Sequence, residues 1–188
     1  MTLIGRLWVV VGFFVAGCLV MAGGALAQAP AVEVTAGYAG FVDDATISHG
    51  VIGGLARWQV TPRLGIGPEV TYMRGPRSDR DLFVMGNVTW DLVSGGSRRP
   101  GRVVPYVLGG AGFFRHFDRF GPLSFASNEG TFTAGGGARA WVTPRVYVGG
   151  EARFGWELHT RVTGTVGVQL GRCPPAVTRG PGTRRAWR

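Results

Sequence analysis

The sequence predicts an all-β fold, an eight-stranded antiparallel up-and-down barrel, from three observations. Segments of about ten residues alternate apolar and polar side chains, which is the period of a strand with one apolar face. The turn Val-Thr-Pro-Arg and the alternating strand after it occur twice, within 58–73 and 140–156, so one hairpin design is repeated. Gly, Pro, Asp and Ser separate the segments, and no amphipathic helix of useful length follows the N-terminal region. Successive strands of this kind fit a closed barrel.

The first four expected strands are joined by short polar connections. Asp43 and Asp44 end the first strand, and Thr61-Pro62-Arg63 turns the chain after the second, because proline presets the turn geometry. Pro68 removes a ladder hydrogen bond from the third strand, so a local irregularity is expected there. A charged loop over 75–80 leads into the fourth strand. The expected ranges are 32–41, 49–60, 64–74 and 81–91.

The last four expected strands include one whose facing the pattern leaves open. Both faces of the fifth strand carry apolar residues or glycine, and the longest expected loop, 115–129, follows it. In the sixth strand Thr131, Thr133 and Arg139 share the polar face, and in the seventh the polar face includes Glu151. A very short loop then precedes the eighth strand. The expected ranges are 102–114, 130–141, 146–156 and 161–170.

Residues 1–27 have the form of a signal peptide. Arg6 precedes an apolar run, and Ala25-Leu26-Ala27 has the small-x-small form of a cleavage site, so the chain is expected to be exported. Residues 15–18 also resemble a lipobox, which would leave Cys18 lipidated, but the apolar run continues past Cys18 and favours ordinary cleavage. The barrel is then expected over 28–170, followed by a basic, Pro- and Arg-rich disordered tail over 171–188.

The charged residues are unevenly distributed along the chain, and the chain contains no lysine. Five arginines lie after Leu170 and one lies in the signal segment, which leaves 14 arginines against 11 acids, a net +3, over 28–170. The formal charge of +9 therefore reflects the tail, and for an exported chain it argues little for nucleic acid as a partner. Only Cys173 would remain after cleavage at Ala27, so no intramolecular disulfide is expected.

Alternation alone does not separate a membrane barrel from a soluble one, because the two differ only in which way the apolar face turns. Aromatic residues near the strand ends favour the membrane, where they would form two interfacial girdles. Strands of about ten residues, when tilted, also span the hydrocarbon core. The expected girdles contain Trp58, Trp90 and Trp141 at one end and Tyr72, Phe114 and Trp156 at the other.

The segments VTPRVYVGGEARFGWEL and VPYVLGGAGFF, with the export signal and eight alternating strands, resemble the small OmpA/OmpW-type outer-membrane β-barrel domains of Gram-negative bacteria. The resemblance extends over residues 31–170 and implies a location in the cell outer membrane. Two features depart from it. Leu170 is followed by a basic tail rather than by a closing aromatic residue, and no peptidoglycan-binding domain of the OmpA kind is expected.

Six charged residues fall on the face expected to line the lumen. An eight-stranded barrel is barely wide enough for its own side chains, and buried charges must pair, so a salt-bridge network that plugs the lumen is expected. The alternative is a path for protons or a small solute that these pairs gate. The six residues are Glu33, Arg57, Glu69, Arg139, Glu151 and Arg153.

Five arginines belong to the connections expected on the outer side of the membrane. They could donate bidentate hydrogen bonds to lipopolysaccharide phosphates, or they could form a solvated surface with the acids near them. Outer-membrane lipid is accordingly the expected partner. The five are Arg74, Arg77, Arg80, Arg115 and Arg119.

A barrel enzyme acting on lipid would need a histidine beside a serine and an acid at the membrane edge. His49 follows Ser48, and His116 lies near Asp118, but no convincing triad spacing occurs, and His159 is expected in a loop. No catalytic role, metal site or cofactor is therefore expected. The expected function is that of a monomeric outer-membrane barrel with a structural or surface-interaction role. The alternatives are a soluble exported carrier of a small apolar ligand and a lipid-modifying enzyme.

Overall fold

The computed structural model describes residues 30–42, 46–77, 79–93, 98–120, 123–156 and 159–170. The expected signal peptide, the lipidation at Cys18 and the expected tail lie outside these residues. Among the residues described, no helix is both long and apolar enough to cross a membrane.

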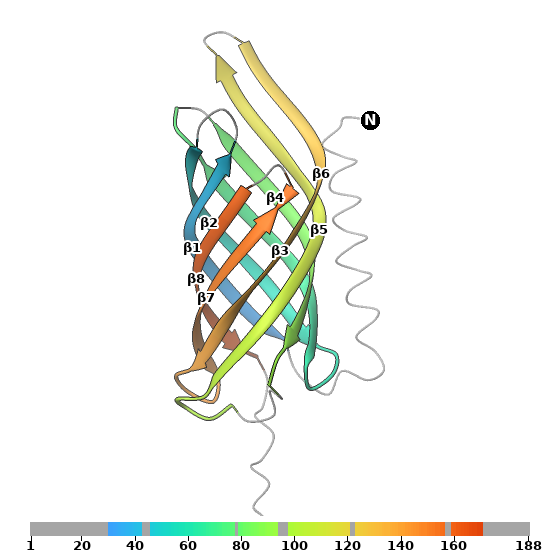
Figure 1. Cartoon of the computed structure of the whole chain (residues 1–188), viewed down its shortest axis with the longest axis vertical. Coiled ribbons are helices and arrows are strands. Elements are labelled where there is room, and N and C mark those ends of the chain that lie inside the picture. The colour runs from blue at the N-terminus through green and yellow to red at the C-terminus, as the bar shows by residue number, and fades with distance from the viewer. Residues whose placement is uncertain are drawn as a thin grey trace, which may run out of the picture.

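Eight antiparallel strands close into one barrel, in which each strand pairs with its neighbours in the sequence and β1 also pairs with β8 (Figure 1). The prediction of an eight-stranded antiparallel barrel is confirmed. The strands are β1 (Ala31–Val42), β2 (Thr46–Gln59), β3 (Leu64–Arg74), β4 (Arg80–Asp91), β5 (Val103–Phe120), β6 (Leu123–Trp141), β7 (Val146–Gly155) and β8 (His159–Gln169).

The two ends of the barrel differ in their connections. The lower end of the barrel in Figure 1 carries residues 30 and 170 and the tight turns at 60–63 and 142–145. In both turns a threonine hydroxyl accepts the backbone N–H three residues on, Thr61 from Leu64 and Thr143 from Val146, each at 2.9 Å. This shared geometry is what the repeated Thr-Pro-Arg sequence predicts. The opposite end is called the upper end below.

The prediction of a long loop over 115–129 is wrong. β5 and β6 continue as a paired hairpin, from Arg115 opposite Asn128 up to Phe120 opposite Leu123. The hairpin rises beyond the other strands at the upper end (Figure 1). Two neighbouring segments satisfy each other's backbone hydrogen bonds whatever their side chains, so a strand pair that projects from the wall needs no apolar face.

An irregularity occurs at Pro68, as predicted. The β2–β3 pairing runs to Leu55 opposite Glu69 and resumes at Trp58 opposite Ile66. A proline cannot donate to the ladder, which explains the interruption on this side of β3. Gly67 lies within the gap, where a Cβ atom would collide with the backbone oxygen of Ala56, so the close approach of the two strands requires glycine.

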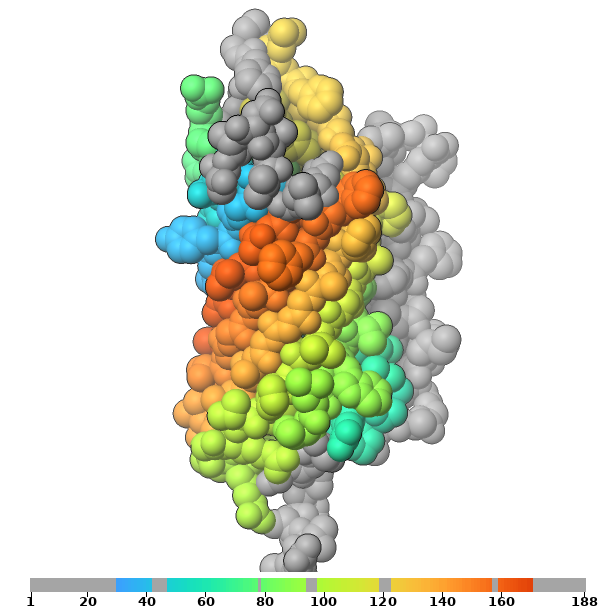
Figure 2. Space-filling view, viewed as in Figure 1, coloured from blue at the N-terminus to red at the C-terminus, as the bar shows by residue number. Residues whose placement is uncertain are grey.

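The barrel is apolar outside and polar inside. Glu69 is 3 % exposed, whereas the next residue, Val70, is 49 % exposed. In a wall one strand thick, this alternation sends every second side chain outward. Figure 2 shows the strands packed side by side on one face, inclined to the long axis. The outward apolar residues include Val34, Ile52, Val70, Val88, Val107, Val148, Val162 and Val166.

Candidate functional site

The side chains that point into the barrel lie in layers, and two of these layers are ionic. In the lower one, Arg57 Nη2 lies 2.7 Å from Glu33 Oε1 and donates to the Tyr147 hydroxyl at 2.8 Å. The Tyr147 hydroxyl donates in turn to Glu33 at 2.7 Å. Arg139 pairs with Asp91, and its guanidinium lies 4.4 Å from the centre of the Tyr106 ring.

The second ionic layer lies above the first and centres on Glu69. Its carboxylate pairs with Arg153 at 2.8 Å and Arg161 at 2.6 Å. It also accepts hydrogen bonds from Thr71 and Asn87, both at 2.7 Å. A carboxylate that accepts four donors has most of its lone pairs satisfied, which is the condition for burying a charge.

Glu151 joins the second layer to the tyrosines. It pairs with Arg153 and accepts the Tyr106 hydroxyl at 2.9 Å. Among the described residues, the two layers contain four carboxylates and four guanidinium groups, so their charges balance. They are Glu33, Glu69, Asp91 and Glu151 with Arg57, Arg139, Arg153 and Arg161.

The structure brings together all six charges predicted for the lumen, and every one of them is buried. It adds two that the prediction left out, Asp91 and Arg161. Both could have been found, because Asp91 shares its parity with Asn87 in β4, and Arg161 shares its parity with Thr163 in β8.

An apolar layer lies above the ionic ones, and it corrects the girdle assignment of Phe114. This residue is 6 % exposed and stacks inside the barrel on Phe83, with ring centres 5.1 Å apart. Alternation cannot predict this placement, because both faces of β5 carry apolar residues or glycine and neither is marked as the inner one. The layer comprises Ala39, Val51, Met73, Phe83, Met85 and Phe114.

Trp141 is the second correction to the girdles. It is 9 % exposed and packs against Tyr147, with ring centres 4.8 Å apart, in an apolar cluster that also contains Ala31 and Val104. Its parity is that of Arg139, so the alternation of β6 already pointed it inward. The other four girdle residues lie on the outer face, Trp58 and Trp90 toward the lower end and Tyr72 and Trp156 toward the upper end.

Two histidines and two aspartates meet at the upper end of the lumen, where no such cluster is predicted. His49 Nε2 lies 2.8 Å from Asp79 Oδ2 and 3.6 Å from Asp81 Oδ2. His116 Nδ1 lies 2.7 Å from Asp81 Oδ1 and 3.6 Å from Asp79 Oδ1. The expectation of a loop histidine at 159 is also wrong, since His159 begins β8 and is buried.

The arginines predicted for the outer loops lie mostly on the outer wall near the upper end. Arg74 and Arg80 are exposed and stand directly opposite each other on β3 and β4. Arg115 lies on the same face of β5, opposite Leu82, with its guanidinium 4.5 Å from the centre of the Phe117 ring. Arg77 is exposed in the β3–β4 connection with φ 59°. The side chain of Arg119 lies outside the described part of the structure.

No protein-family model and no curated protein matches this sequence. The fold is similar to that of Neisserial surface protein A, with a TM-score of 0.65 and 13 % identity over 75 % of this chain and 97 % of that one. It is also similar to the N-terminal β-barrel domain of Pseudomonas aeruginosa OprF, with a TM-score of 0.50 and 15 % identity over 74 % of this chain and 97 % of that domain.

The fold is that of a small outer-membrane β-barrel. The comparison agrees with the distribution of side chains, because an apolar outer wall around an ionic interior suits a bilayer rather than water. A soluble carrier would turn the apolar face of each strand inward around a cavity. The structure turns that face outward, which contradicts the soluble alternative.

We expect Tyr147→Phe to lower the free energy of unfolding of this outer-membrane barrel by about 1–3 kcal/mol, since Glu33 loses a buried donor and Arg57 a buried acceptor. Urea titration in detergent, followed by tryptophan fluorescence, measures the change. Tyr38→Phe is the control, because Tyr38 is 74 % exposed. Loss of its hydroxyl should lower the free energy of unfolding by less than about 0.5 kcal/mol. Equal effects of the two variants would show that the hydrogen bonds of the Tyr147 hydroxyl do not stabilise the barrel.

Proposed function

We propose that this protein is a monomeric barrel with a closed lumen, whose upper end lies outside the cell and contacts the phosphates of outer-membrane lipopolysaccharide. The β5–β6 hairpin, which projects beyond the other strands at the upper end, supports this orientation, because outer-membrane barrels carry their larger extensions outside the cell. The expectation that the longer connections lie at the outer end is wrong, since the longest one, 92–102, joins β4 to β5 at the lower end. The role is one of surface interaction rather than transport.

The observation that carries the proposal is the pair Arg74 and Arg80. They are cross-strand partners on the outer face, and like charges directly opposite each other destabilise a sheet. Among the described residues neither forms an ion pair. An anion held between the two guanidinium groups would offset their repulsion, and phosphate matches the geometry of the guanidinium fork.

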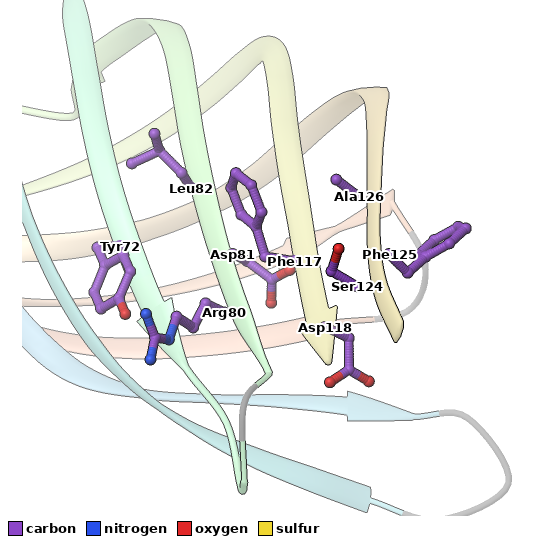
Figure 3. Close-up of a pocket in the computed structure, with 9 residues that line it drawn as sticks. All are labelled: Tyr72, Arg80, Asp81, Leu82, Phe117, Asp118, Ser124, Phe125 and Ala126. Carbon is purple, nitrogen blue, oxygen red and sulfur yellow. The ribbon is translucent and has the colours of Figure 1, made fainter. Parts of the chain in front are cut away.

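A hollow of about 570 Å³ beside this pair supports a lipid ligand. Tyr72 and Arg80 lie next to each other along it, and Leu82 and Phe117 add apolar surface (Figure 3). A guanidinium beside aromatic and aliphatic surface suits a ligand with a phosphate and acyl chains. The hollow is lined by Tyr72, Arg80, Asp81, Leu82, Phe117, Asp118, Ser124, Phe125 and Ala126.

The layers of the lumen support a barrel closed to solutes. Two balanced ionic layers lie below an apolar layer in which Phe83 and Met73 are almost fully buried. A solute would have to displace paired charges and packed rings in succession, and each step leaves buried polar or apolar groups without partners. We therefore assign the salt-bridge network to stability rather than to a gated path.

A non-enzymatic role is supported by the placement of the histidines. Ser48 and His49 are consecutive in β2 and point to opposite sides of the wall, Ser48 exposed and His49 buried. His116 hydrogen-bonds to the Asp81 carboxylate rather than to a hydroxyl. Neither arrangement presents the hydroxyl and base that nucleophilic catalysis needs within hydrogen-bond reach.

We expect lipopolysaccharide to raise the unfolding temperature of the purified barrel in detergent, and Arg74→Gln/Arg80→Gln to remove most of that increase. A ligand that binds only the folded state raises its apparent stability, and the double variant removes two of its charge-assisted contacts. The loss of the heat-sensitive gel mobility of the folded barrel measures the transition.

Two controls separate phosphate binding from loss of charge. Arg63→Gln/Arg145→Gln removes two exposed arginines from the lower turns and should leave the increase intact. Lipopolysaccharide stripped of phosphate should give no increase with any variant. The proposal fails if the Arg74/Arg80 variant responds to lipopolysaccharide as the unchanged protein does.

A further inference from the structure

The His–Asp cluster at the upper end of the lumen is assembled from separate parts of the wall. His49 lies in β2, Asp79 precedes β4, Asp81 lies within β4 and His116 lies in β5. Residues 30 and 35 positions apart in the sequence come into hydrogen-bond distance through the strand register. Donors held by several strands keep a fixed geometry, which is a requirement for a metal site.

The separations between the donor atoms match those of a metal ion's ligands. The four His–Asp distances lie between 2.7 and 3.6 Å. In a tetrahedral zinc site, with bonds of about 2.0 Å, neighbouring ligand atoms lie roughly 3.3 Å apart. One donor atom from each of His49, Asp79 and Asp81 can be chosen so that all three lie within 4.8 Å of one another. His116 lies outside this group of three, although its Nδ1 is 2.7 Å from Asp81 Oδ1, and its side chain would have to move closer to His49 to supply a fourth donor.

The charge of the cluster calls for a cation. In the layers below, each carboxylate faces a guanidinium, but among the described residues Asp79 and Asp81 form ion pairs only with the two histidines. Neutral imidazoles leave the charge of two neighbouring carboxylates uncompensated. Asp79 Oδ1 is buried and has no hydrogen-bond partner in the structure, so one oxygen of the cluster is left with a free lone pair.

Gly75 leaves space beside the donors. A Cβ atom at this position would lie 2.5 Å from both Asp79 Oδ2 and His49 Nε2, so any side chain there would crowd the two atoms. His116 and Asp79 are partly exposed, with side-chain exposures of 31 % and 18 %, which gives an ion a route from the upper end.

From these observations we propose that the upper end of the barrel binds one divalent transition-metal ion through His49, Asp79, Asp81 and His116. Two imidazoles and two carboxylates suit Zn²⁺, and they suit Mg²⁺ poorly because it prefers oxygen ligands and retains its water. The ion would join the β1–β2, β3–β4 and β5–β6 hairpins at the mouth of the barrel. The site is distinct from the Arg74–Arg80 pair, which lies on the outer wall, and it adjoins the hollow beside that pair, because Asp81 also lines the hollow.

The test is calorimetric titration with Zn²⁺ of the protein purified from outer membranes, without a histidine tag and with Cys173→Ser as the background. EDTA is first used to strip metal and is then removed. We expect saturation at one ion per chain, no saturable binding of Mg²⁺, and a loss of affinity of at least about tenfold in His116→Ala and in Asp79→Asn. Gly75→Ala should also weaken binding, because its methyl group crowds two donors.

His159→Gln is the matched control, since this buried histidine hydrogen-bonds to the Trp156 carbonyl and lies outside the cluster. It should bind Zn²⁺ as the background protein does. Zn²⁺ should also raise the unfolding temperature of the background protein and not that of His116→Ala, provided that both show the gel mobility of a folded barrel. The proposal is overturned if the background protein shows no saturable Zn²⁺ binding, or if His116→Ala and Asp79→Asn bind with unchanged affinity. If the cluster holds only two His–Asp hydrogen bonds and binds no metal, one of those two results is expected.

Discussion

Replacement of Glu69 by alanine is expected to destabilise the barrel by about 3–5 kcal/mol, the cost of removing one partner of a buried ion pair. Arg161 would keep the Thr71 hydroxyl at 3.1 Å and, as its only carboxylate, Glu151 at 3.9 Å. Asn87 and Thr71 would lose Glu69 as their acceptor. Arg153 would keep Glu151 and Asn87. Unfolding in urea, in detergent micelles and followed by tryptophan fluorescence, gives the free energy.

Glu129→Ala is the matched control for Glu69→Ala. Glu129 is an exposed glutamate on the projecting part of β6, and its loss should change the free energy of unfolding by less than about 0.5 kcal/mol. If Glu69→Ala proved as mild as this control, the ionic layers would not hold the wall together, and the closed lumen proposed above would lose its basis.

Arginine in place of Val70 is expected to impair assembly into the membrane. Val70 is half exposed on the outer face between Gly54 and Val84, within the apolar belt, and an arginine facing lipid costs about 2–4 kcal/mol at the bilayer midplane. The measurement is the fraction of protein that acquires the heat-sensitive gel mobility when it folds into lipid vesicles.

Leu123→Arg provides the comparison for Val70→Arg. Leu123 is 73 % exposed, but it lies on the hairpin that projects beyond the other strands, where an arginine faces water. Folding of this variant should match that of the unchanged chain. Equal folding yields for the two variants would mean that the face carrying Val70 does not meet lipid.

Local alternation predicted most of the fold. The eight strands, the inward facing of Glu69 and Glu151 and the outward facing of Val70 and Val148 all follow from a period of two that starts in the right phase. The same rule, carried to the strand ends, would have placed Trp141, Asp91 and Arg161 correctly. For Trp141, the usual preference of aromatic residues for the membrane interface conflicts with parity, and the structure follows parity.

Other features depend on tertiary register and could not be predicted from local pattern. Glycine and apolar residues on both faces of β5 hid the inward facing of Tyr106 and Phe114. The polar composition of 115–129 concealed a hairpin whose pairing depends on the backbone alone. The His–Asp cluster joins His49 to Asp79 and Asp81 to His116, and these pairs become neighbours only when the register of β2 to β5 is fixed.

The central claim is that the apolar face of each strand meets lipid while the charges lie inside. It is tested most directly by fractionation of cells that express the full chain, followed by gel electrophoresis of the outer-membrane fraction with and without boiling. The account predicts a band that stays in this fraction after a urea wash and whose mobility changes on heating. A soluble periplasmic or secreted product with one mobility would contradict it, because such a chain could not leave this apolar wall in water.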